Sequence, residues 1–417
     1  MTSPALQQLA GRVRSAARVV ARAPSSVRDD ALRLAADLLE EEWATLVEAN
    51  RTDLAQAEAA GMVEAARDRL RLTEERVQGM AAGLRKVAAL PDPVGEVTEG
   101  WVRPTGLRVS RVRVPLGVVG VIYENRPNVT SDAAGLCLKA GNAAFLRGSS
   151  SAIESNRAVV ALLRQAAVKA GLPEDSVALV EDTSHETATA FMQLRGFIDC
   201  LLPRGGQALI ASLIEHATVP YVLDGDGNCH IYIDGAADLA MAHELAINAK
   251  THRFGVCNAV ETILVHSGVA AEFLPRLAGS LASAGVEIRG DERVQALVPT
   301  AVPALESDFS TEFLGPVVAI GMVDDVGEAI EHIAQYSSGH SEAIVTSDVA
   351  VADRFVAEVD GAAVLVNAST RFVDGEELGL GAEVGISTQK LHARGPMGVK
   401  ELTTLKWIVR GDGQVRR

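Results

Sequence analysis

The stretch Gly117-Val118-Val119-Gly120-Val121-Ile122-Tyr123 decides the fold class. It is a short apolar run rich in β-branched residues, which predicts a buried strand. Further runs of this kind alternate with helical patterns, and we expect strands at 143–146, 177–180, 198–202 and 219–223. This alternation is typical of a doubly wound parallel sheet with helices on both faces.

A second alternating series follows and predicts a second α/β domain. Its expected strands are 229–233, 261–265, 317–322, 341–346 and 363–366, and its expected helices are 239–250, 269–284, 326–336 and 350–359. The boundary between the two series falls near 224–229, where Gly225 and Gly227 favour a hinge.

The chain before the first strand has two parts. The first ninety residues are rich in Ala, Leu, Arg and Glu and predict helices that end near Pro91-Asp92-Pro93. Several arginines precede the first acidic residue, Asp29, as in a mitochondrial transit peptide, but the helical spacing favours a structural helix. Near-alternating β-branched residues over 95–114 predict an extended hairpin with no local helix to cover it, so we expect a partner subunit to supply its missing face.

Composition excludes several classes of function. The chain has 417 residues and a net charge of -15, and that charge opposes a polyanionic partner such as nucleic acid. No apolar run approaches the roughly 20 residues that a membrane span needs. The 4 cysteines are too sparse for a disulfide framework or a zinc site, and a reducing cytoplasm fits them best.

Two glycine-containing turns are candidate phosphate sites. The dinucleotide pattern GxGxxG is absent after the first strand. Instead, Arg147-Gly148-Ser149-Ser150-Ser151 and Pro203-Arg204-Gly205-Gly206 follow expected strands, where open α/β sheets bind ligands. Either segment alone reads as an ordinary tight turn, but together they favour a phosphate-bearing cofactor.

Cys257 is the candidate nucleophile. It follows the end of an expected helix, and Lys250, His252 and Arg253 are near in sequence, where they can supply the positive potential that a thiolate needs. A single cysteine is more often a small buried hydrophobe, and Cys137 and Cys200 fit that alternative. 

Two other polar features have competing interpretations. Asn128 follows a strand and can donate to an oxyanion, but on residue type alone it fits a turn or helix cap better. Cys229 and His230 are adjacent strand residues that point to opposite faces, so we expect no metal site there.

Several long motifs, in this order, resemble one family. They are Arg126-Pro127-Asn128-Val129-Thr130, Pro203-Arg204-Gly205-Gly206, 256–262, 366–372, 379–388 and 390–398. The chain resembles the glutamate-5-semialdehyde dehydrogenases, also called gamma-glutamyl phosphate reductases, a branch of the aldehyde dehydrogenase superfamily.

The resemblance implies an aldehyde dehydrogenase-like α/β fold with two doubly wound domains and a β-arm for oligomerisation. The implied cofactor domain is 1–94 and 115–226, and the implied catalytic domain is 227–380. The arm is 95–114 with 399–417, and 381–398 returns to the cofactor domain.

The resemblance also implies a reaction. NADPH would reduce L-glutamyl 5-phosphate to L-glutamate 5-semialdehyde and phosphate, the second step of proline synthesis from glutamate. Cys257 would attack the acyl phosphate and carry the substrate as a thioester. Asn128 and the Cys257 backbone N–H would stabilise the tetrahedral oxygen.

Binding roles follow from the same resemblance. Glu312 lies in a segment similar to the superfamily's Glu-x-Phe-Gly-Pro, whose glutamate holds the nicotinamide ribose, although Leu314 replaces the usual aromatic residue. Arg147 stands where a ribose-binding lysine is usual and is expected to pair with the 2′-phosphate of NADP(H). Residues expected to bind the cofactor are Arg147, Gly148, Ser149, Gly205, Gly206 and Glu312. Candidates for the substrate's phosphate and α-carboxylate are Arg126, Arg253, Arg371 and Arg394.

One departure from the superfamily is informative. The glutamate that activates water in hydrolytic members aligns near Leu223, or near Asp224 if the alignment slips by one residue. A reductase that exchanges its acyl group with phosphate does not need a base for water. The rival interpretations are a generic NAD(P)-dependent aldehyde dehydrogenase, a non-catalytic oligomeric scaffold and a thiol hydrolase. Expected partners are the small-molecule substrate, further copies of the chain in a dimer or tetramer, and transiently a separate glutamate 5-kinase.

Overall fold

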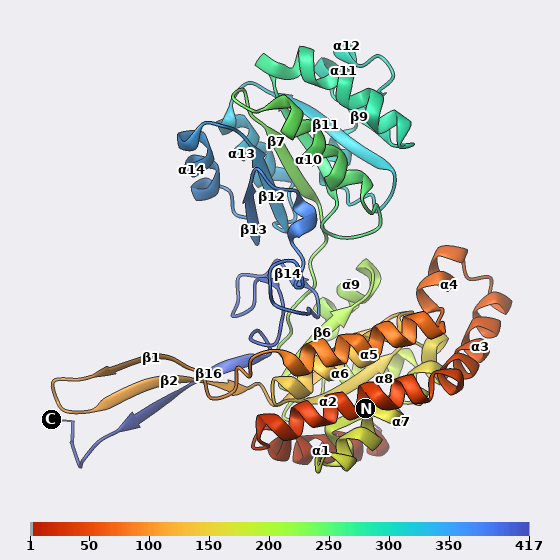
Figure 1. The fold of residues 1–417 in the computed structure, drawn as a ribbon, viewed down its shortest axis with the longest axis vertical. Helices are drawn as coiled ribbons and strands as arrows, with labels where there is room; N and C mark the ends of the chain where they lie inside the picture. The colour runs from red at the N-terminus through yellow and green to blue at the C-terminus, as the bar shows by residue number, and fades with distance from the viewer. Residues whose placement is uncertain (1–2, 417) are drawn as a thin grey trace. The chain divides into compact units, whose positions relative to one another are not determined.

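The computed structural model describes residues 3–416, which form two compact units (Figure 1). Unit 1 holds the described residues up to Leu223 together with Leu380–Gly385 and those from Met397 onward. Unit 2 holds Asp224–Gly379 and Ile386–Pro396. 

Unit 1 is built on a four-stranded parallel sheet in the order β5-β4-β3-β6. Its strands are β3 (Val118–Tyr123), β4 (Ala143–Gly148), β5 (Val177–Leu179) and β6 (Cys200–Arg204). Its helices are α1 (Pro4–Val20), α2 (Ser25–Glu41), α3 (Trp43–Ala59), α4 (Glu64–Leu70), α5 (Glu74–Ala89), α6 (Pro127–Lys139), α7 (Ile153–Lys169), α8 (His185–Met192) and α9 (Gln207–His216), with 3₁₀ turns at Ser150–Ala152 and Glu174–Ser176.

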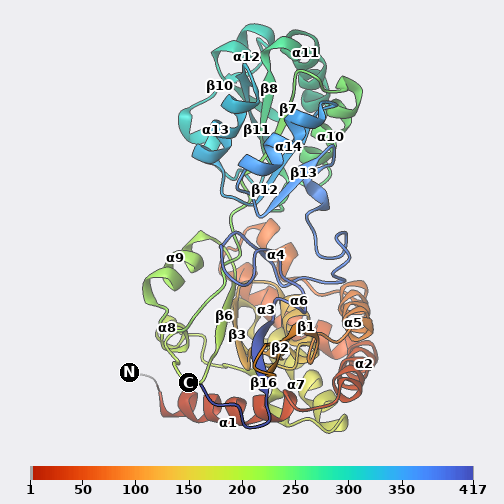
Figure 2. The same cartoon turned by 90° about the vertical axis from the view of Figure 1, so that its left-hand side faces the viewer.

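Helices cover both faces of this sheet. The apolar stripe of α1, including Leu6 and Val13, packs against Val118 and Phe145 on one face. Residues of the opposite parity such as Val119 are also fully buried, and α6 contacts β4 while α7 contacts β5. Figure 2 shows helices of unit 1 around β3 and β6. The prediction of a doubly wound α/β fold is confirmed, and α1 is a structural helix within this core.

One predicted strand is wrong. Val219–Leu223 makes only an isolated bridge, between Leu201 and Tyr221. Pro220 lies in this segment and has no N–H to donate to a ladder, so pairing is limited to the Leu201 N–H to Pro220 O bond and the Val222 N–H to Leu201 O bond.

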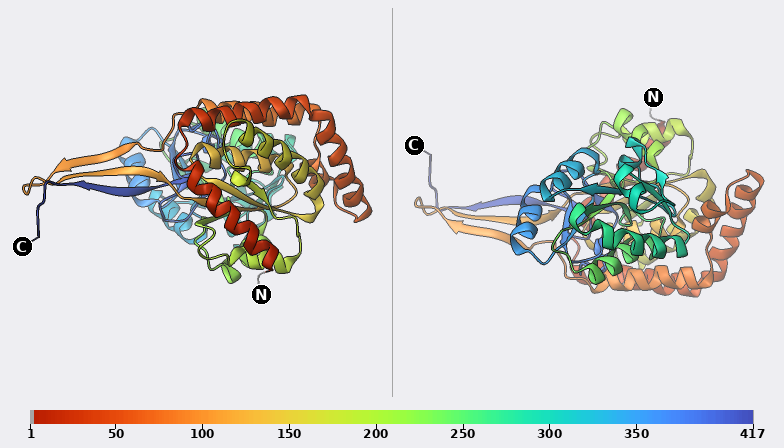
Figure 3. Two further views of the ribbon diagram at one scale, coloured as in Figure 1. Left: turned by 90° about the horizontal axis from the view of Figure 1, so that it is seen from below. Right: turned by 90° about the horizontal axis from the view of Figure 1, so that it is seen from above.

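A three-stranded antiparallel arm also belongs to unit 1. It contains β1 (Val97–Val102), β2 (Arg108–Pro115) and β16 (Thr403–Arg410) in the order β1-β2-β16. The two views of Figure 3 agree that these strands lie side by side. Trp101 and Trp407 meet edge to face at 5.6 Å between ring centroids, and the Arg111 guanidinium lies over the Trp407 ring. The predicted hairpin is confirmed, and the C-terminal strand completes it.

Unit 2 is built on a seven-stranded parallel sheet in the order β10-β9-β11-β8-β7-β12-β13. Its strands are β7 (Cys229–Ile233), β8 (Val260–His266), β9 (Glu287–Gly290), β10 (Val302–Pro303), β11 (Val317–Val323), β12 (Ser341–Val345) and β13 (Ala363–Val366). Its helices are α10 (Leu239–Thr251), α11 (Ser267–Ser283), α12 (Glu292–Leu297), α13 (Val326–Tyr336) and α14 (Val349–Glu358), with 3₁₀ turns at Glu306–Ser310 and Thr370–Phe372.

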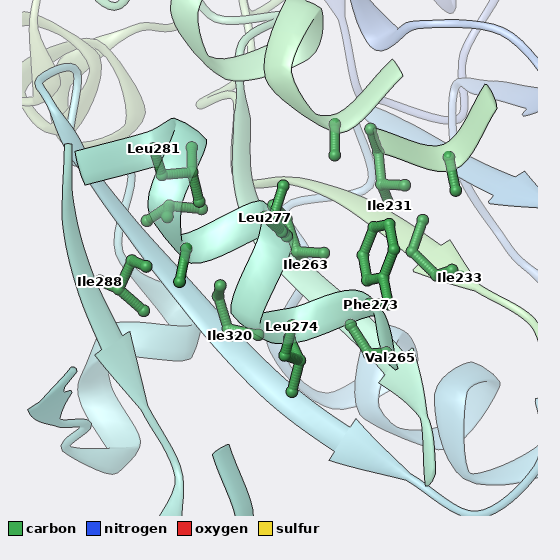
Figure 4. Packing of buried hydrophobic residues seen from close by; sticks show 14 of the residues in the cluster. Ile231, Ile233, Ile263, Val265, Phe273, Leu274, Leu277, Leu281, Ile288 and Ile320 are labelled. Carbon is green, nitrogen blue, oxygen red and sulfur yellow. The ribbon is translucent and has the colours of Figure 1, made fainter. Parts of the chain in front are cut away.

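Strand alternation divides the core of unit 2 into two layers. Ile231 and Ile263 point to the face covered by α10 and α11, where Phe273 packs among them (Figure 4). Tyr232 and Leu264, one residue further along each strand, point to the opposite face and pack under α13 and α14. Both faces are therefore buried, which explains why these strands are continuous apolar runs.

The segment 381–398 departs from the predicted division. The resemblance implies that all of it returns to the cofactor domain, whereas Ile386–Pro396 belongs to unit 2. The Ile386 N–H donates to the Asp224 carboxylate and its carbonyl accepts from the Gly225 N–H, and β14 (Ile386–Ser387) pairs with β15 (Gly395–Pro396). These hydrogen bonds hold the segment to the start of unit 2.

Within residues 3–416, no helix combines the length and apolar character that crossing a bilayer requires.

Candidate active site

Cys257 is a half-buried thiol in the loop between α10 and β8, at the amino end of the strand. The buried Cys229 thiol donates to the Cys257 carbonyl oxygen at 3.1 Å. The next residue is also anchored, because Asn258 Nδ2 donates to Val373 O at 2.9 Å and Thr370 Oγ1 donates to Asn258 O at 2.7 Å. The nucleophile loop is thus held from several elements of unit 2.

Gly227 joins the nucleophile loop to Glu312. A β-carbon at Gly227 would lie 1.7 Å from the Cys257 carbonyl oxygen, so only glycine fits this contact. The Gly227 N–H donates to Glu312 Oε1 at 2.8 Å. Burial raises the pKa of Glu312, against the lowering effect of this hydrogen bond. Gly227 is therefore required for close packing, beside any role at a hinge.

Two arginines gather near the thiol in unit 2. Arg371 Nε donates to His252 Nδ1 at 3.3 Å, and Arg253 is exposed next to His252 in the chain. Burial lowers the pKa of Arg371, as does the charge of Arg253, while Asp374 and then Cys257 raise it. Arg371 is therefore a partly buried cation whose charge acts on Cys257.

Arg394 has a different environment from Arg371. Its guanidinium donates to the Asp360 carboxylate at 2.8 Å and to the Asp360 carbonyl oxygen at 3.1 Å. Lys390 shares the same carboxylate. Arg394 is thus already paired with a carboxylate of unit 2, which makes it a weaker candidate for an anionic substrate.

In unit 1, Glu124 connects the ends of β3 and β6. Its backbone N–H donates to Arg204 O at 3.1 Å, and its carboxylate accepts the Gly206 N–H at 3.0 Å. A β-carbon at Gly205 would lie 2.7 Å from the Glu124 carboxyl carbon. The chain continues from β3 to β4 on one side and returns to β6 on the other, so these turns lie at a topological switch point.

The turn after β4 gathers hydroxyl groups. Ser149 Oγ donates to Asn125 Oδ1 at 3.1 Å, and Ser151 Oγ also contacts Asn125 Oδ1. A β-carbon at Gly148 would overlap the Asn156 side chain. These side chains come from the carboxyl ends of β3 and β4.

Arg147 is a residue of β4 just before this turn. Its Nη2 donates to Thr183 O at 2.6 Å and to Ser184 O at 3.0 Å. Its Nε is buried without a hydrogen-bond partner among the described residues. Burial lowers its pKa.

Asn128 lies in the first turn of α6, where Arg126 is the N-cap residue and has no side-chain capping bond. Asn128 Nδ2 donates to Asp132 Oδ2 at 3.0 Å, one helical turn further along. Burial raises the pKa of Asp132 to about 6, although the hydrogen bonds from Asn128 and Ser131 oppose this. Of the alternatives for Asn128, helix capping is wrong, because the N-cap position belongs to Arg126.

The candidate residues of unit 1 lie at the carboxyl ends of its strands, whereas three candidate residues of unit 2 lie at the amino ends of theirs. In unit 1 they follow β3, β4 and β6, at the carboxyl edge. In unit 2, Gly227, Cys257 and Glu312 precede β7, β8 and β11, at the amino edge. Ligands of open α/β sheets usually bind at the carboxyl edge, and these three candidate residues of unit 2 lie at the other edge.

Sequence reasoning missed several side chains that complete these sites. Asp132 carries the one usable signal, since it stands four residues after Asn128 within a helix. No such sequence signal exists for the other four side chains, because their partners are distant in the chain. These are Glu124, Asn125, Glu261 and Thr370. 

The remaining thiols fit the core. Cys137 and Cys200 are buried, and burial raises the pKa of Cys200 to about 12. The interpretation of these two cysteines as core residues is confirmed.

Comparisons with known proteins agree along nearly the whole chain. The model of the aldehyde dehydrogenase family matches residues 5–296 and 287–408. A gamma-glutamyl phosphate reductase of Moorella thermoacetica is 54% identical over 406 residues, which cover 97% of this chain and 97% of that protein. The crystal structure of gamma-glutamyl phosphate reductase from Thermotoga maritima has a TM-score of 0.97 and 47% identity, with 99% of each chain covered. The reductase structure from Saccharomyces cerevisiae is more distant, with a TM-score of 0.54 and 29% identity over 100% of this chain and 99% of that one.

Proposed function

Because this chain belongs to the aldehyde dehydrogenase family and, within it, to the gamma-glutamyl phosphate reductases, we propose that it reduces L-glutamyl 5-phosphate with NADPH through a Cys257 thioester. The products are L-glutamate 5-semialdehyde and phosphate, in the second step of proline synthesis from glutamate. The observation that supports a thioester intermediate is the environment of Cys257. It is a half-buried thiol on an anchored loop, and the charge of Arg371 acts on it.

Cys257 attacks the acyl carbon as a thiolate, and phosphate leaves. Arg371 and Arg253 favour the thiolate over the thiol and attract a substrate that carries a phosphate and a carboxylate. His252 accepts the Arg371 Nε–H and so orients the guanidinium. Arg126 of unit 1 is a further candidate for binding the substrate, and Arg394 is the weakest because it already pairs with Asp360.

Asn128 is the proposed oxyanion donor together with the Cys257 backbone N–H. One Asn128 amide hydrogen is given to Asp132, which leaves the other for the developing oxyanion. Removing one such donor typically costs roughly 10²–10³ in turnover.

The residues fit a phosphate-bearing nicotinamide cofactor. Arg147 has a buried Nε without a partner among the described residues, and Ser149 adds a hydroxyl at the same strand end. Gly205 and Gly206 form a turn at the start of α9, whose N-terminus favours anions and whose Gly206 N–H is accepted in this structure by the Glu124 carboxylate. These residues, with Gly148 and Glu312, would hold NADP(H). When bound, this cofactor supplies the hydride that reduces the acyl carbon.

No base for water is assigned in the proposed mechanism. Leu223 is an apolar residue packed against the core of unit 1, and the Asp224 carboxylate accepts the Ile386 N–H at 2.8 Å. A thioester that is slow to hydrolyse suits exchange with phosphate.

We extend the proposal to assembly and location. The arm carries exposed apolar side chains, including Val102, Trp407 and Val409, which suit contact with another copy in a dimer or tetramer. All 4 cysteines are free thiols, as a reducing cytoplasm favours. The lability of an acyl phosphate favours transient contact with a glutamate 5-kinase.

The test is NADP⁺ reduction with glutamate semialdehyde, with and without phosphate or arsenate. We expect turnover only when the anion is present, and none in Cys257→Ala. Turnover at full rate without the anion would instead identify a generic aldehyde dehydrogenase. Turnover by Cys257→Ala would exclude the thioester, and inactivity of the unaltered protein would favour a scaffold.

A further inference from the structure

Lys250 and Glu261 form an ion pair with both side chains fully buried in unit 2. Lys250 lies near the end of α10, and Glu261 lies at the start of β8, so the two flank the nucleophile loop. Lys250 Nζ donates to Glu261 Oε2. Burial raises the pKa of Glu261 to about 7 and lowers that of Lys250, while their mutual attraction opposes both shifts.

The second carboxylate oxygen of Glu261 has a separate partner. Glu261 Oε1 accepts the backbone N–H of Leu314 at 3.2 Å. Leu314 has a φ of 51°, in the left-handed region where a residue with a β-carbon costs roughly 1–2 kcal/mol. Its side chain is 45% exposed, so packing of that side chain does not explain the conformation. The hydrogen bond to Glu261 is an interaction that can offset this cost.

The turn at Leu314 also determines where Glu312 lies. Glu312 stands two residues before Leu314, and its Oε1 accepts the Gly227 N–H at 2.8 Å. Lys250 acts electrostatically on Glu312 as well as on Glu261. One buried pair is therefore coupled to the turn that carries Glu312.

Stability alone is a weak explanation for such a pair. Replacing a buried ion pair with apolar residues of similar volume is often neutral or stabilising, because removing two charges from water is costly. A hydrogen-bond acceptor for Leu314, in contrast, cannot be supplied by an apolar side chain.

We propose that Glu261, whose Oε2 pairs with Lys250, is a positioning residue whose Oε1 holds the Leu314 turn and thereby directs the Glu312 carboxylate toward the nicotinamide ribose. This inference rests on the proposed function for the role of Glu312. Lys250 and Glu261 touch neither substrate nor cofactor in this role. They act through the Leu314 backbone.

Two double variants isolate the acceptor. Lys250→Met with Glu261→Gln removes both charges and keeps a side-chain oxygen for Leu314, whereas Lys250→Met with Glu261→Leu removes that oxygen too. We expect the Gln variant to keep its KM for NADPH within about 3-fold and the Leu variant to raise it about 10-fold, the equivalent of one hydrogen bond of roughly 1.4 kcal/mol. At saturating NADPH, kcat should fall much less. Equal KM values in the two variants would overturn the proposal.

A second readout does not depend on turnover. Amide hydrogen exchange of Leu314, measured without nucleotide, should be slow in the unaltered protein and in the Gln variant and fast in the Leu variant. Equal exchange in all three overturns the positioning role. A further outcome is that the Leu314 exchange rate differs between the two variants while the unaltered protein lacks NADPH-linked turnover. In that case the proposed function is wrong, but the effect of Glu261 on the turn is supported.

Leu314→Pro changes the exposed donor residue of the same hydrogen bond and leaves the buried pair intact. It is the alternative test if the Leu variant does not fold. Proline has no N–H and fixes φ near −65°, which removes both the hydrogen bond and the left-handed conformation. We expect the KM for NADPH to rise at least as much as in the Leu variant. A folded Leu314→Pro protein with an unchanged KM contradicts the proposal.

Discussion

Gly227 and Cys257 are in direct backbone contact, so that a β-carbon on the glycine would lie 1.7 Å from the cysteine carbonyl oxygen. The same glycine donates its N–H to Glu312. A single residue without a side chain thus links the proposed nucleophile to the proposed cofactor glutamate.

Substituting this glycine should displace the nucleophile. In Gly227→Ala the new methyl group collides with backbone atoms, which cannot rotate away, so the Cys257 loop must move. A shift of about 1 Å can cost about 10²-fold in rate, and we expect at least that loss in kcat/KM. Steady-state turnover and the alkylation rate of Cys257 by iodoacetamide measure the effect.

Gly279→Ala is the matched control. Gly279 is exposed in α11, and nothing lies within 4 Å of the β-carbon it would gain. This change should leave turnover unaltered and stabilise the helix by roughly 0.5–1 kcal/mol. Gly227→Ala with control-like kinetics would show that the contact is dispensable.

Asp132 should impose a pH dependence through Asn128. Its pKa of about 6 means that the carboxylate, which accepts the Asn128 N–H, is protonated in mild acid. We expect kcat/KM to fall below pH 6 as this acceptor weakens, and the inflection to be absent in Asp132→Asn. Superimposable pH profiles for the two proteins would count against a role for Asp132.

The same substitution has a predicted sign for stability. Because burial raises the pKa of Asp132 in the folded state, folding favours its protonated form, and the contribution of Asp132 to the free energy of unfolding falls as pH rises from about 4 to 6. Asp132→Asn removes that charge and should be more stable than the unaltered protein at pH 7. Urea unfolding at pH 4 and pH 7 measures this difference, and a variant less stable at pH 7 would contradict it.

Much of the fold could be predicted from local pattern. Strands such as Cys229–Ile233 are buried on both faces, so they appear as continuous apolar runs between helical repeats. The strands β9 and β10 are not predicted because they are short and are the two outermost strands on one side of the sheet, where Glu287 and Val302 are exposed. The segment around Pro220 shows the opposite error, a predicted strand that does not form. It is apolar, but Pro220 lacks the N–H that a strand needs.

The site was predictable only in part. Cys257 and Asn128 were found through motifs, but their partners depend on contacts between distant segments. Nothing near Gly227 in the chain indicates that it packs against Cys257, and the pairing of Glu261 with Leu314 requires the order β11-β8 in the sheet. Such contacts arise from tertiary structure, which residue type and spacing do not encode locally.

Arg371 and Arg394 should differ in importance although both were candidates for anion binding. Arg371→Gln removes a cation that acts on Cys257, and a lost charge-assisted hydrogen bond of about 1.5–3 kcal/mol predicts roughly a 10- to 100-fold loss in kcat/KM for the acyl substrate. Alkylation of Cys257 should also slow. Arg394→Gln breaks only its pairing with Asp360 and should stay within about 3-fold. A larger loss of kcat/KM in Arg394→Gln than in Arg371→Gln would instead indicate that Arg394 binds the substrate.

Two histidines of unit 2 should make the protein sensitive to acid. Burial lowers the pKa of His332 and of His340 to about 4, and His340 is fully buried against Cys229 and Ser341. Between pH 6.5 and pH 4 the unfolded chain binds protons that the folded protein excludes. The stabilising contribution is therefore complete above pH 6.5 and is lost as pH falls toward 4, by at most about 1.4 kcal/mol per pH unit for each group.

His340→Asn tests this acid sensitivity. An asparagine keeps polar atoms near Ser341 but does not titrate, so the fall in unfolding free energy between pH 6.5 and pH 4 should be shallower even if the variant is less stable at pH 7. His392→Asn is the control, since His392 is exposed and its replacement should leave the slope as it is. Urea unfolding at half-unit steps of pH gives the slopes. If His340→Asn loses stability in acid as steeply as the unaltered protein, the cause lies in other groups, because the one proton that His340 excludes on folding no longer contributes.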